Sequence, residues 1–393
     1  LWIAAGGALG GLFNTFAAPV LFVTPIEYPL VVIAACVLFA DGLTWRRLTR
    51  EPRLAYVATV LPALVLIVAT QLIFRVDWNL PESTRIRSAL AALPALALAL
   101  VFRKSPLRLA VGLALLLIVA PRVRIDDRVI LHTERNFFGV LRVTDTGFEH
   151  VLLSGTTIHG SQAVDPALRC EPLSYYTRSG PIGQLFAVFR QGSKQARIGV
   201  VGLGTAAVSA YARPGDTWTY FEINPADVRI ARTPEYFTYL PDCAPDARVV
   251  LGDARLSLER QSDGAFDILI IDAFSSDAIP VHLMTAEAVS LYLRKLSATG
   301  LLVLHISNRY LDLAPVVAAI VEVQGLAAAI QDYQPELEET NQLSALPSRW
   351  VVVAHHRADL QPLLATGRWP EPVGAAGPRW TDDYSNVLRI IKR

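Results

Sequence analysis

The sequence is poor in cysteine and carries almost no net charge. Its three cysteines, Cys36, Cys170 and Cys243, are far apart and lack the spacing of a metal site, so we expect free thiols in a reducing compartment. The formal net charge is +1, and no stripe of Lys and Arg alternates with aromatic residues. This excludes the usual charge pattern of a nucleic-acid-binding protein. No metal site is expected either, because histidines such as His159 and His282 are isolated.

Apolar residues are abundant instead, at 52% of the 393 residues. Long apolar runs fill the first third of the chain, and Arg and Lys are mostly confined to the connectors. This pattern predicts an integral membrane domain over 1–121 with four or five spans in contact with lipid. The alternative for the shorter runs is buried helices of a soluble protein. The runs are Leu1–Thr24, Tyr28–Ala40, Leu54–Phe74, Ala89–Phe102 and Leu107–Ala120.

The start of the chain and its charges bear on how this domain inserts. The first residue is Leu1, and no basic segment precedes the first apolar run. We therefore expect a piece of a longer membrane protein and not a cleavable signal peptide. Basic residues are nearly equal in number on the two sides of a five-span arrangement, so the positive-inside rule predicts no orientation.

Two further regions follow the apolar domain. From 126 to 194, short β-rich runs such as FFGVLRV and HVLLSG alternate with Gly and polar turns, which predicts a small antiparallel β unit. From 196 to 393, strands alternate with helical stretches, and this favours the α/β class with a Rossmann-like, mostly parallel sheet covered on both faces. The strand-like runs are RIGVVGLG, TWTYFEIN, ARVVLGD, FDILIIDAF, LLVLHISN and RWVVVAHH.

Several of these predicted strands end in glycine or in an acid. Gly202 and Gly204 follow the first strand and precede small residues that open a predicted helix, Glu222 ends the second, Asp253 follows the third, and Asp272 ends the fourth. The carboxyl ends of parallel strands meet at one edge, where nucleotides bind. We expect these side chains to form one site, with Glu222 accepting hydrogen bonds from ribose hydroxyls.

The loop after the first strand reads G-L-G-T-A-A, with Ala207 where a third glycine would stand. Dinucleotide sites prefer three glycines, although some accept Ala there. A compact adenosine-bearing ligand, such as a sulfonium nucleoside, fits this loop better.

The stretch DILIIDAFSSDAIP places two carboxylates, Asp272 and Asp277, directly after a strand-like run. Aspartate and serine also favour helix N-caps, so capping of a helix in VHLMTAEAV is the alternative for these two acids. Because both acids are present together with the other strand-end acids, we expect at least one of them to act in the site.

Taken together, the sequence resembles the spermidine synthase (polyamine aminopropyltransferase) family, and more specifically its membrane-fused branch. The resemblance lies in the order of four motifs that follow a β-rich unit containing YY. They are a strand followed by GxG, a strand that ends in Glu, the sequence GDA and the sequence DILIIDAFSSDAIP. GGALGGLFNTFAAP, EYPL and TDDYSN also resemble that branch. It implies a class I methyltransferase/spermidine synthase type of fold and a homodimer. It also implies transfer of an aminopropyl group from decarboxylated S-adenosylmethionine to a polyamine, with release of 5′-methylthioadenosine and no metal.

The resemblance also assigns residues. It implies that Glu222 binds the ribose and that Asp253 and Ala254 bind the adenine. Asp272 would be the base near the reacting nitrogen, and Asp277 the second acid of a gating loop. Further candidates are Tyr175 as an aromatic wall against the sulfonium, the first loop with Gly202, Gly204 and Thr205, and a late loop with Asp382, Asp383 and Tyr384 that closes the site.

The sequence departs from the family pattern at the amine end. Thr205 stands where the first loop usually has an acid, Tyr175-Tyr176 replaces a Tyr-Gln pair, and Asn308-Arg309 replaces a Glu-Gln pair. Arg309 would repel a polyamine and could bind a carboxylate through its planar guanidinium. If it is not merely a surface residue, the ligand is S-adenosylmethionine itself, and a lyase that forms methylthioadenosine and homoserine lactone becomes an alternative activity.

The sequence is also compatible with two other functions: methyl transfer from S-adenosylmethionine, and a membrane sensor or transporter subunit that binds the nucleoside without catalysis. Because adenosyl sulfonium compounds are made in the cytoplasm, we expect the catalytic domain on the cytoplasmic side of a bacterial-type inner membrane.

Overall fold

The structure is a computed structural model of the 393-residue chain. It describes residues 1–39, 96–119, 128–191, 195–273, 280–372 and 377–392, with isolated positions between 57 and 93. Residue contacts divide the chain into two units, Leu1–Arg128 and Val129–Arg393. The division falls close to residue 126, where the β unit is predicted to begin.

The first unit is helical in its described parts. Its helices are α1 (Trp2–Leu12), the π-helical turn η1 (Phe13–Ala17), α2 (Ala18–Leu21), α3 (Glu27–Leu38) and α7 (Pro106–Val119). The continuous helical segment Trp2–Leu21 is 20 residues long, and among the described residues it alone is long and apolar enough to cross a membrane. The predicted run Leu54–Phe74 lies largely outside the described residues. The number of spans therefore stays a prediction.

The second unit begins with an antiparallel sheet in the strand order β1-β2-β3-β4. Its strands are β1 (Val129–Asn136), β2 (Gly139–Asp145), β3 (Glu149–Ser154) and β4 (Thr157–Ala163). One face buries Leu141, Val143 and Leu152 against helix α9 (Pro225–Ala231) and Phe237. The strands occupy the first part of the predicted unit 126–194, and the chain after β4 forms the 3₁₀ turns η3 (Pro166–Leu168) and η4 (Ser174–Tyr176) and the helix α8 (Pro181–Phe189).

The main sheet has seven strands in the order β10-β11-β9-β8-β5-β6-β7. Strands β7, β6, β5, β8 and β9 run parallel, whereas β11 runs antiparallel to both of its neighbours. The predicted α/β class with a mostly parallel sheet is confirmed. The strands are β5 (Arg197–Val201), β6 (Thr217–Glu222), β7 (Arg248–Leu251), β8 (Phe266–Ile271), β9 (Leu296–His305), β10 (Ala327–Tyr333) and β11 (Ser348–Ala354).

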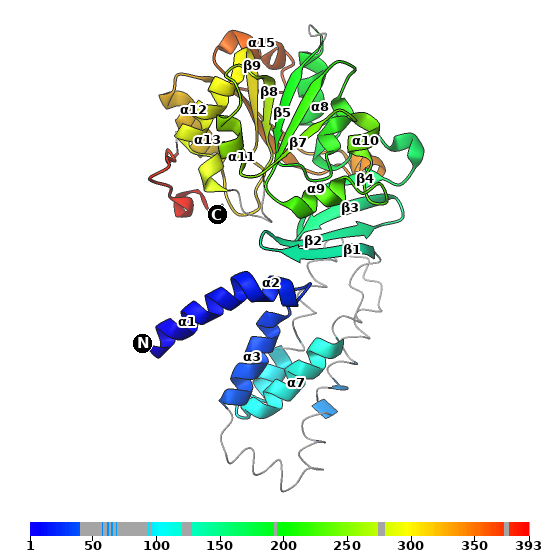
Figure 1. The fold of residues 1–393 in the computed structure, drawn as a ribbon, viewed down its shortest axis with the longest axis vertical. Helices are drawn as coiled ribbons and strands as arrows, with labels where there is room; N and C mark the ends of the chain where they lie inside the picture. Colours follow the sequence, from blue (N-terminus) through cyan, green and yellow to red (C-terminus); the bar gives the residue numbers. More distant parts are fainter. Residues whose placement is uncertain are drawn as a thin grey trace. The chain divides into compact units, whose positions relative to one another are not determined.

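Helices cover both faces of this sheet (Figure 1). Ile268 and Ile270 of β8 enter the core on the side of α8 and α15, whereas Leu269 and Ile271 enter the core beneath α12 and α13. Burial on both faces explains why the strands read as nearly continuous apolar runs. The remaining elements are η5 (Ala207–Tyr211), α10 (Tyr239–Cys243), α11 (Ala254–Glu259), η6 (Val281–Leu283), α12 (Ala286–Lys295), α13 (Ala314–Val323), α14 (Leu337–Leu343), α15 (Arg357–Leu364) and η7 (Val387–Ile390).

Two of the three cysteines are bonded to each other. Cys170 and Cys243 form a disulfide with a Cα–Cα distance of 5.9 Å, whereas Cys36 is free. The prediction of free thiols was therefore wrong for this pair. Cys170 precedes η4 and Cys243 ends α10, and the Tyr239 hydroxyl of α10 donates to the carbonyl of Glu171 at 2.8 Å. The fold brings together two segments 73 residues apart, which spacing alone does not reveal.

Candidate active site

The carboxyl ends of the parallel strands open into a cavity of about 700 Å³. The structure brings most of the predicted site residues to its wall: Tyr175, Gly202, Gly204, Glu222, Asp253, Ala254, Asp272 and Arg309. Two are not among them. The Thr205 side chain is buried against Gly160 and does not line the cavity, and Asp277 lies outside the described residues.

The two glycines of the first loop are required by neighbouring backbone. Gly202 has φ +93° and Gly204 has φ +51°. A Cβ atom would lie 2.2 Å from the Asp272 carbonyl oxygen at the first position and 2.4 Å from the His159 carbonyl oxygen at the second. The helix predicted after this loop is only the 3₁₀ turn η5. It offers no long helix N-terminus to a diphosphate.

Glu222 and Asp227 form a buried acidic pair on the wall of the cavity. The Glu222 carboxylate accepts hydrogen bonds from the backbone N–H groups of Leu203 (2.8 Å) and Asn224 (2.7 Å). Burial raises the pKa of Glu222, although these donors oppose the shift. Burial and the charge of Glu222 raise the pKa of Asp227 well above its ordinary range. A pair that holds a proton this readily can both donate to and accept from ribose hydroxyls.

Replacing Asp227 with Asn will flatten the dependence of stability on pH. Because burial raises the pKa of Asp227, the folded state binds the proton more tightly than the unfolded state. The free energy of unfolding is then highest below the ordinary value of 3.8 and falls as the pH rises through the raised value. Its Oδ1 atom has no hydrogen-bond partner among the described residues, so at neutral pH the variant gains about 1 kcal/mol.

Urea unfolding at several pH values between about 4 and 8 checks this expectation. Asp242→Asn, at an exposed residue outside the cavity wall, is the control. The raised pKa would be contradicted if the free energy of unfolding of the parent protein rises with pH at least as steeply as that of the Asp227→Asn variant.

Asp253 and Ala254 stand at the start of helix α11. Asp253 caps this helix, because its Oδ1 atom accepts the backbone N–H of Leu256 at 2.9 Å. Its other oxygen lies 3.4 Å from His282 Nε2. Asp253 therefore has a structural role and faces the cavity as well, whereas Ala254 leaves space beside it.

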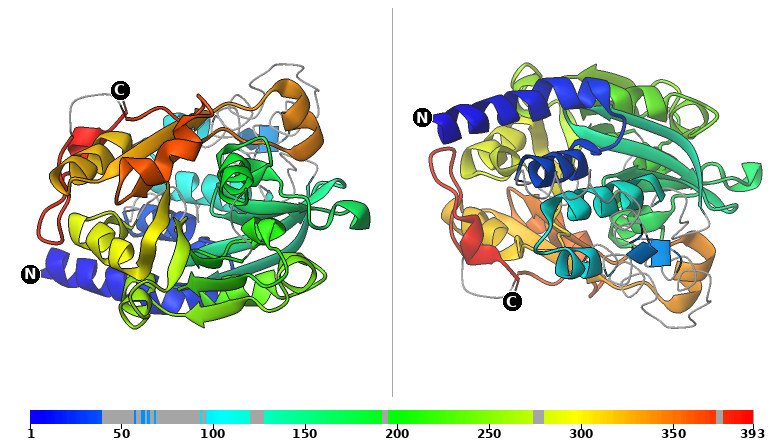
Figure 2. Two further views of the ribbon diagram at one scale, coloured as in Figure 1. Left: turned by 90° about the horizontal axis from the view of Figure 1, so that it is seen from above. Right: turned by 90° about the horizontal axis from the view of Figure 1, so that it is seen from below.

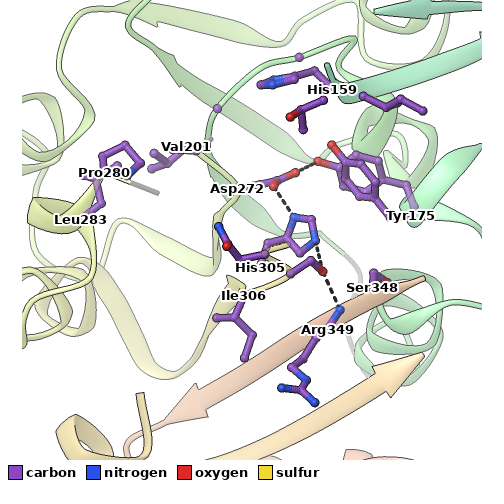
Figure 3. Close-up of a pocket in the computed structure, with 18 of the residues that line it drawn as sticks. His159, Tyr175, Val201, Asp272, Pro280, Leu283, His305, Ile306, Ser348 and Arg349 are labelled. Carbon is purple, nitrogen blue, oxygen red and sulfur yellow. Dashed lines mark hydrogen bonds and ion pairs between the residues drawn. The ribbon is translucent and has the colours of Figure 1, made fainter. Parts of the chain in front are cut away.

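Asp272 is at the centre of a hydrogen-bonded cluster in the cavity wall (Figure 3). It follows β8, and its side chain is 5% exposed. Oδ1 lies 2.6 Å from His305 Nδ1, and the Tyr176 hydroxyl donates to Oδ2. In Figure 3, Val201, Pro280 and Leu283 lie on one side of Asp272 and Tyr175 lies on the other.

The cluster continues from His305 to Ser307. His305 Nε2 lies 2.7 Å from the Ser307 hydroxyl, which accepts the backbone N–H of Arg349 at 2.8 Å. The serine proton is then available to His305 Nε2, and Nδ1 carries the proton that His305 donates to Asp272. His305 thereby connects the Ser307 hydroxyl to the Asp272 side chain on the cavity wall.

Aromatic rings hold this cluster in place. The rings of His305 and Trp350 are stacked with centroids 4.1 Å apart, and β9 and β11 pair these two residues directly. Tyr175 lies 4.9 Å from the His305 ring. Burial and the nearby charge of Asp272 raise the pKa of both Tyr175 and Tyr176, so both remain neutral phenols. Ser174, with φ +62°, begins the turn that presents them.

Helix capping does not explain Asp272. Helix α12 is capped by Thr285, whose hydroxyl accepts the backbone N–H of Ala288 at 3.2 Å. The late loop predicted to close the site does not line the cavity. Its Asp382 instead makes two hydrogen bonds to the guanidinium of Arg255, at 2.7 and 2.6 Å.

The sequence did not single out His305, Ser307, Tyr176 or Asp227 as site residues. His305 ends a parallel strand in LLVLHISN at the same edge as the acids, so the rule used for Glu222 and Asp272 could have found it. Within the described residues, no group of three or more His, Cys, Asp or Glu side chains could hold a metal ion.

The sequence was also compared with known proteins. No family model matches the chain. A curated polyamine aminopropyltransferase from Vibrio vulnificus (strain CMCP6) is 35% identical over 133 residues. This match covers 33% of the present chain and 42% of the Vibrio protein, which is less than half of that relative.

Solved structures of similar proteins include two spermidine synthases. A probable spermidine synthase from Corynebacterium glutamicum has a TM-score of 0.48 and 18% identity, over 67% of this chain and 99% of that one. A spermidine synthase in complex with the transition-state analogue AdoDATO has a TM-score of 0.40 and 11% identity, over 65% and 81%. The sequence match to the Vibrio protein agrees with the predicted resemblance, because a third of this chain is similar to part of a polyamine aminopropyltransferase.

Proposed function

We propose that this protein is a membrane-anchored enzyme that binds an S-adenosyl sulfonium and cleaves its C–S bond. The three-carbon chain passes to an amine, and 5′-methylthioadenosine leaves. The observation that carries the proposal is the Asp272 carboxylate, held by His305 and Tyr176 in the same cavity as Glu222. The similarity to a protein named polyamine aminopropyltransferase supports the choice of reaction.

The proposed roles follow from the chemistry of each group. The Glu222 and Asp227 pair binds the ribose hydroxyls, and Asp253 accepts a hydrogen bond from the adenine amino group beside Ala254. The Tyr175 ring faces the sulfonium, since a cation is attracted to an aromatic face. A sulfonium is already a good leaving group, so the enzyme mainly aligns the nucleophile with the C–S bond.

Asp272 accepts the proton that the amine loses as it attacks. The attacking nitrogen must be unprotonated before the reaction, and the new bond leaves one proton to remove. A carboxylate already fixed by two donors, His305 and Tyr176, needs little reorganisation to take this role. The Asp272 cluster thereby favours an amine acceptor, because a carboxylate nucleophile brings no proton to remove.

S-adenosylmethionine lyase activity is the second candidate. In that reaction the substrate's own carboxylate attacks its γ-carbon and forms homoserine lactone. The observation that favours it is Arg309, a cation on the cavity wall. Methyl transfer would share the adenosine site but would release S-adenosylhomocysteine, and a nucleoside sensor would release no product.

Mass spectrometry of the products tests all of these candidates. The purified full chain is incubated with S-adenosylmethionine or with its decarboxylated form, each with and without putrescine. We expect methylthioadenosine only when an amine is present. Methylthioadenosine formed without amine would favour the lyase, and S-adenosylhomocysteine would favour methyl transfer. If no donor is consumed, the proposed catalysis is wrong.

Replacing His305 with Leu will lower kcat about 50-fold and leave KM for the donor nearly unchanged, because the donor to Asp272 is lost while the adenosine contacts stay. His305→Asn is the matched variant, since its amide N–H can replace Nδ1–H, and we expect it to recover about tenfold of the loss. Steady-state kinetics of both variants give the result. Equal defects in the two variants would indicate that His305 serves packing alone.

We propose that the helical segment Trp2–Leu21 anchors the enzyme in a bacterial-type inner membrane. The origin of adenosyl sulfonium compounds favours the cytoplasmic face for the α/β unit. The Cys170–Cys243 disulfide favours the opposite face, because disulfides persist in oxidising compartments. Protease digestion of right-side-out and inverted vesicles distinguishes the two arrangements, and light scattering of the purified protein tests for the homodimer.

A further inference from the structure

Three arginine and lysine side chains line the cavity in the described part of the chain: Arg309, Arg349 and Lys392. Arg349 is neutralised by acids. Its Nε atom donates to Asp332 at 2.6 Å, and its Nη1 atom donates to Asp312 at 3.1 Å. Arg349 is therefore part of an ion-pair network and is not available to a ligand.

Arg309 has no such acid. Its guanidinium lies over the ring of Tyr310, with 5.6 Å between the guanidinium carbon and the ring centroid. Its side chain is exposed, and no carboxylate of the described residues pairs with it. A guanidinium held on an aromatic face keeps its N–H donors free to bind an anion.

Lys392 is brought to the same wall by the C-terminal segment. The Lys392 N–H donates to the Tyr310 carbonyl at 2.8 Å, the Asp312 N–H donates to the Ile390 carbonyl at 2.7 Å, and Leu311 and Ile391 form an antiparallel bridge. Figure 2 shows this red segment beside α13. The ammonium donates to the Asn308 carbonyl at 2.7 Å, and none of the ion pairs between described residues involves Lys392.

Arg309 and Lys392 are poorly suited to bind a substrate whose tail carries only a positive charge. The carboxylates on the described wall have other partners or belong to the predicted adenosine end: Glu222, Asp227, Asp253, Asp272 and Asp332. The first loop supplies no acid, since Thr205 stands where the family usually has one. The Thr205 side chain is itself buried away from the cavity. An aminopropyl tail would be repelled by Arg309 and Lys392, whereas a tail that ends in a carboxylate would be attracted.

We infer that the donor keeps its carboxylate: it is S-adenosylmethionine, and the group transferred to the amine is 3-amino-3-carboxypropyl. This inference rests on the proposed function. The amine nitrogen attacks the γ-carbon, the C–S bond breaks, and its electron pair stays on sulfur in neutral methylthioadenosine. The proton lost from nitrogen passes to Asp272, so atoms and charge balance without another reactant.

Binding and turnover test this inference separately. Calorimetry with the full chain compares S-adenosylmethionine, its decarboxylated form and methylthioadenosine. We expect S-adenosylmethionine to bind about 10- to 100-fold more tightly than the decarboxylated form. Arg309→Gln and Lys392→Gln should each remove a large part of this preference and leave the affinity for methylthioadenosine unchanged. The control, Arg368→Gln, changes an exposed cation outside the cavity.

The products then separate the failure of the inference from that of the proposed function. An amine that gains the mass of an aminocarboxypropyl group supports both. Tighter binding or faster turnover of the decarboxylated donor, with no change of preference in Arg309→Gln, overturns the inference alone. Lactone formed from S-adenosylmethionine without amine overturns the transfer step. A binding preference that Arg309→Gln abolishes, without methylthioadenosine in any mixture, supports carboxylate recognition but overturns the proposed catalysis.

Discussion

Replacing Asp272 with Asn will lower the rate of methylthioadenosine release about a thousandfold. The amide keeps the shape of the side chain but cannot accept a proton from the amine. It also places its NH2 group against one of two existing donors, either the Nδ1–H of His305 or the hydroxyl of Tyr176. We expect nucleoside binding to change less than threefold or so, because Glu222 and Asp253 are untouched.

Asp267→Asn is the matched control, because it makes the same substitution at the other end of β8. Asp267 pairs with Arg197 at 2.8 Å, outside the cavity, and its replacement should leave the rate unchanged. Single-turnover kinetics of both variants, with whichever donor the parent consumes, provide the comparison. If Asp272→Asn retains more than about a tenth of the parent rate while folded, Asp272 is not the base.

The sequence was informative where function depends on strand order. Acids at the ends of parallel strands must share one edge of the sheet, and Glu222, Asp253 and Asp272 do line one cavity. Strand β10 was missed, because AAAIQDY is rich in alanine and breaks into polar residues after the fourth position. Its edge position beside β11 requires less apolar surface than a central strand does.

The partners of Asp272 depend on tertiary contacts that no local pattern encodes. Tyr176 precedes Asp272 by 96 residues and reaches it from a short 3₁₀ turn. His305 is positioned by stacking on Trp350 of an antiparallel neighbour. The sequence singled out Tyr175 as an aromatic wall, and it did not reveal that the Tyr176 hydroxyl donates to the carboxylate. A shift of one residue in such a turn redirects the side chain. The sequence alone therefore does not determine which of the two adjacent tyrosines contacts the carboxylate.

Replacing both Cys170 and Cys243 with Ser will lower the free energy of unfolding by about 4 kcal/mol. The disulfide closes a sequence separation of 73 residues, and the chain-entropy model gives this value for a loop of that length. We also expect slower catalysis, because Cys170 lies just before the turn that carries Tyr176. Urea unfolding of the full chain measures the loss. Cys36→Ser is the control, since Cys36 is free and lies in the other unit.

The size of this loss bears on where the α/β unit can work. A typical domain is stable by about 5–15 kcal/mol, so reduction of this one bond would remove a large share of its stability. Labelling free thiols in intact cells before lysis, with Cys36→Ser as background, shows whether the pair is oxidised there. Oxidised cysteines place the unit on the oxidising side of the membrane and require a donor there. Reduced cysteines place the unit in the cytoplasm, where it has the lower free energy of unfolding expected without the disulfide. A loss below about 1 kcal/mol in the double variant would remove this argument for either side.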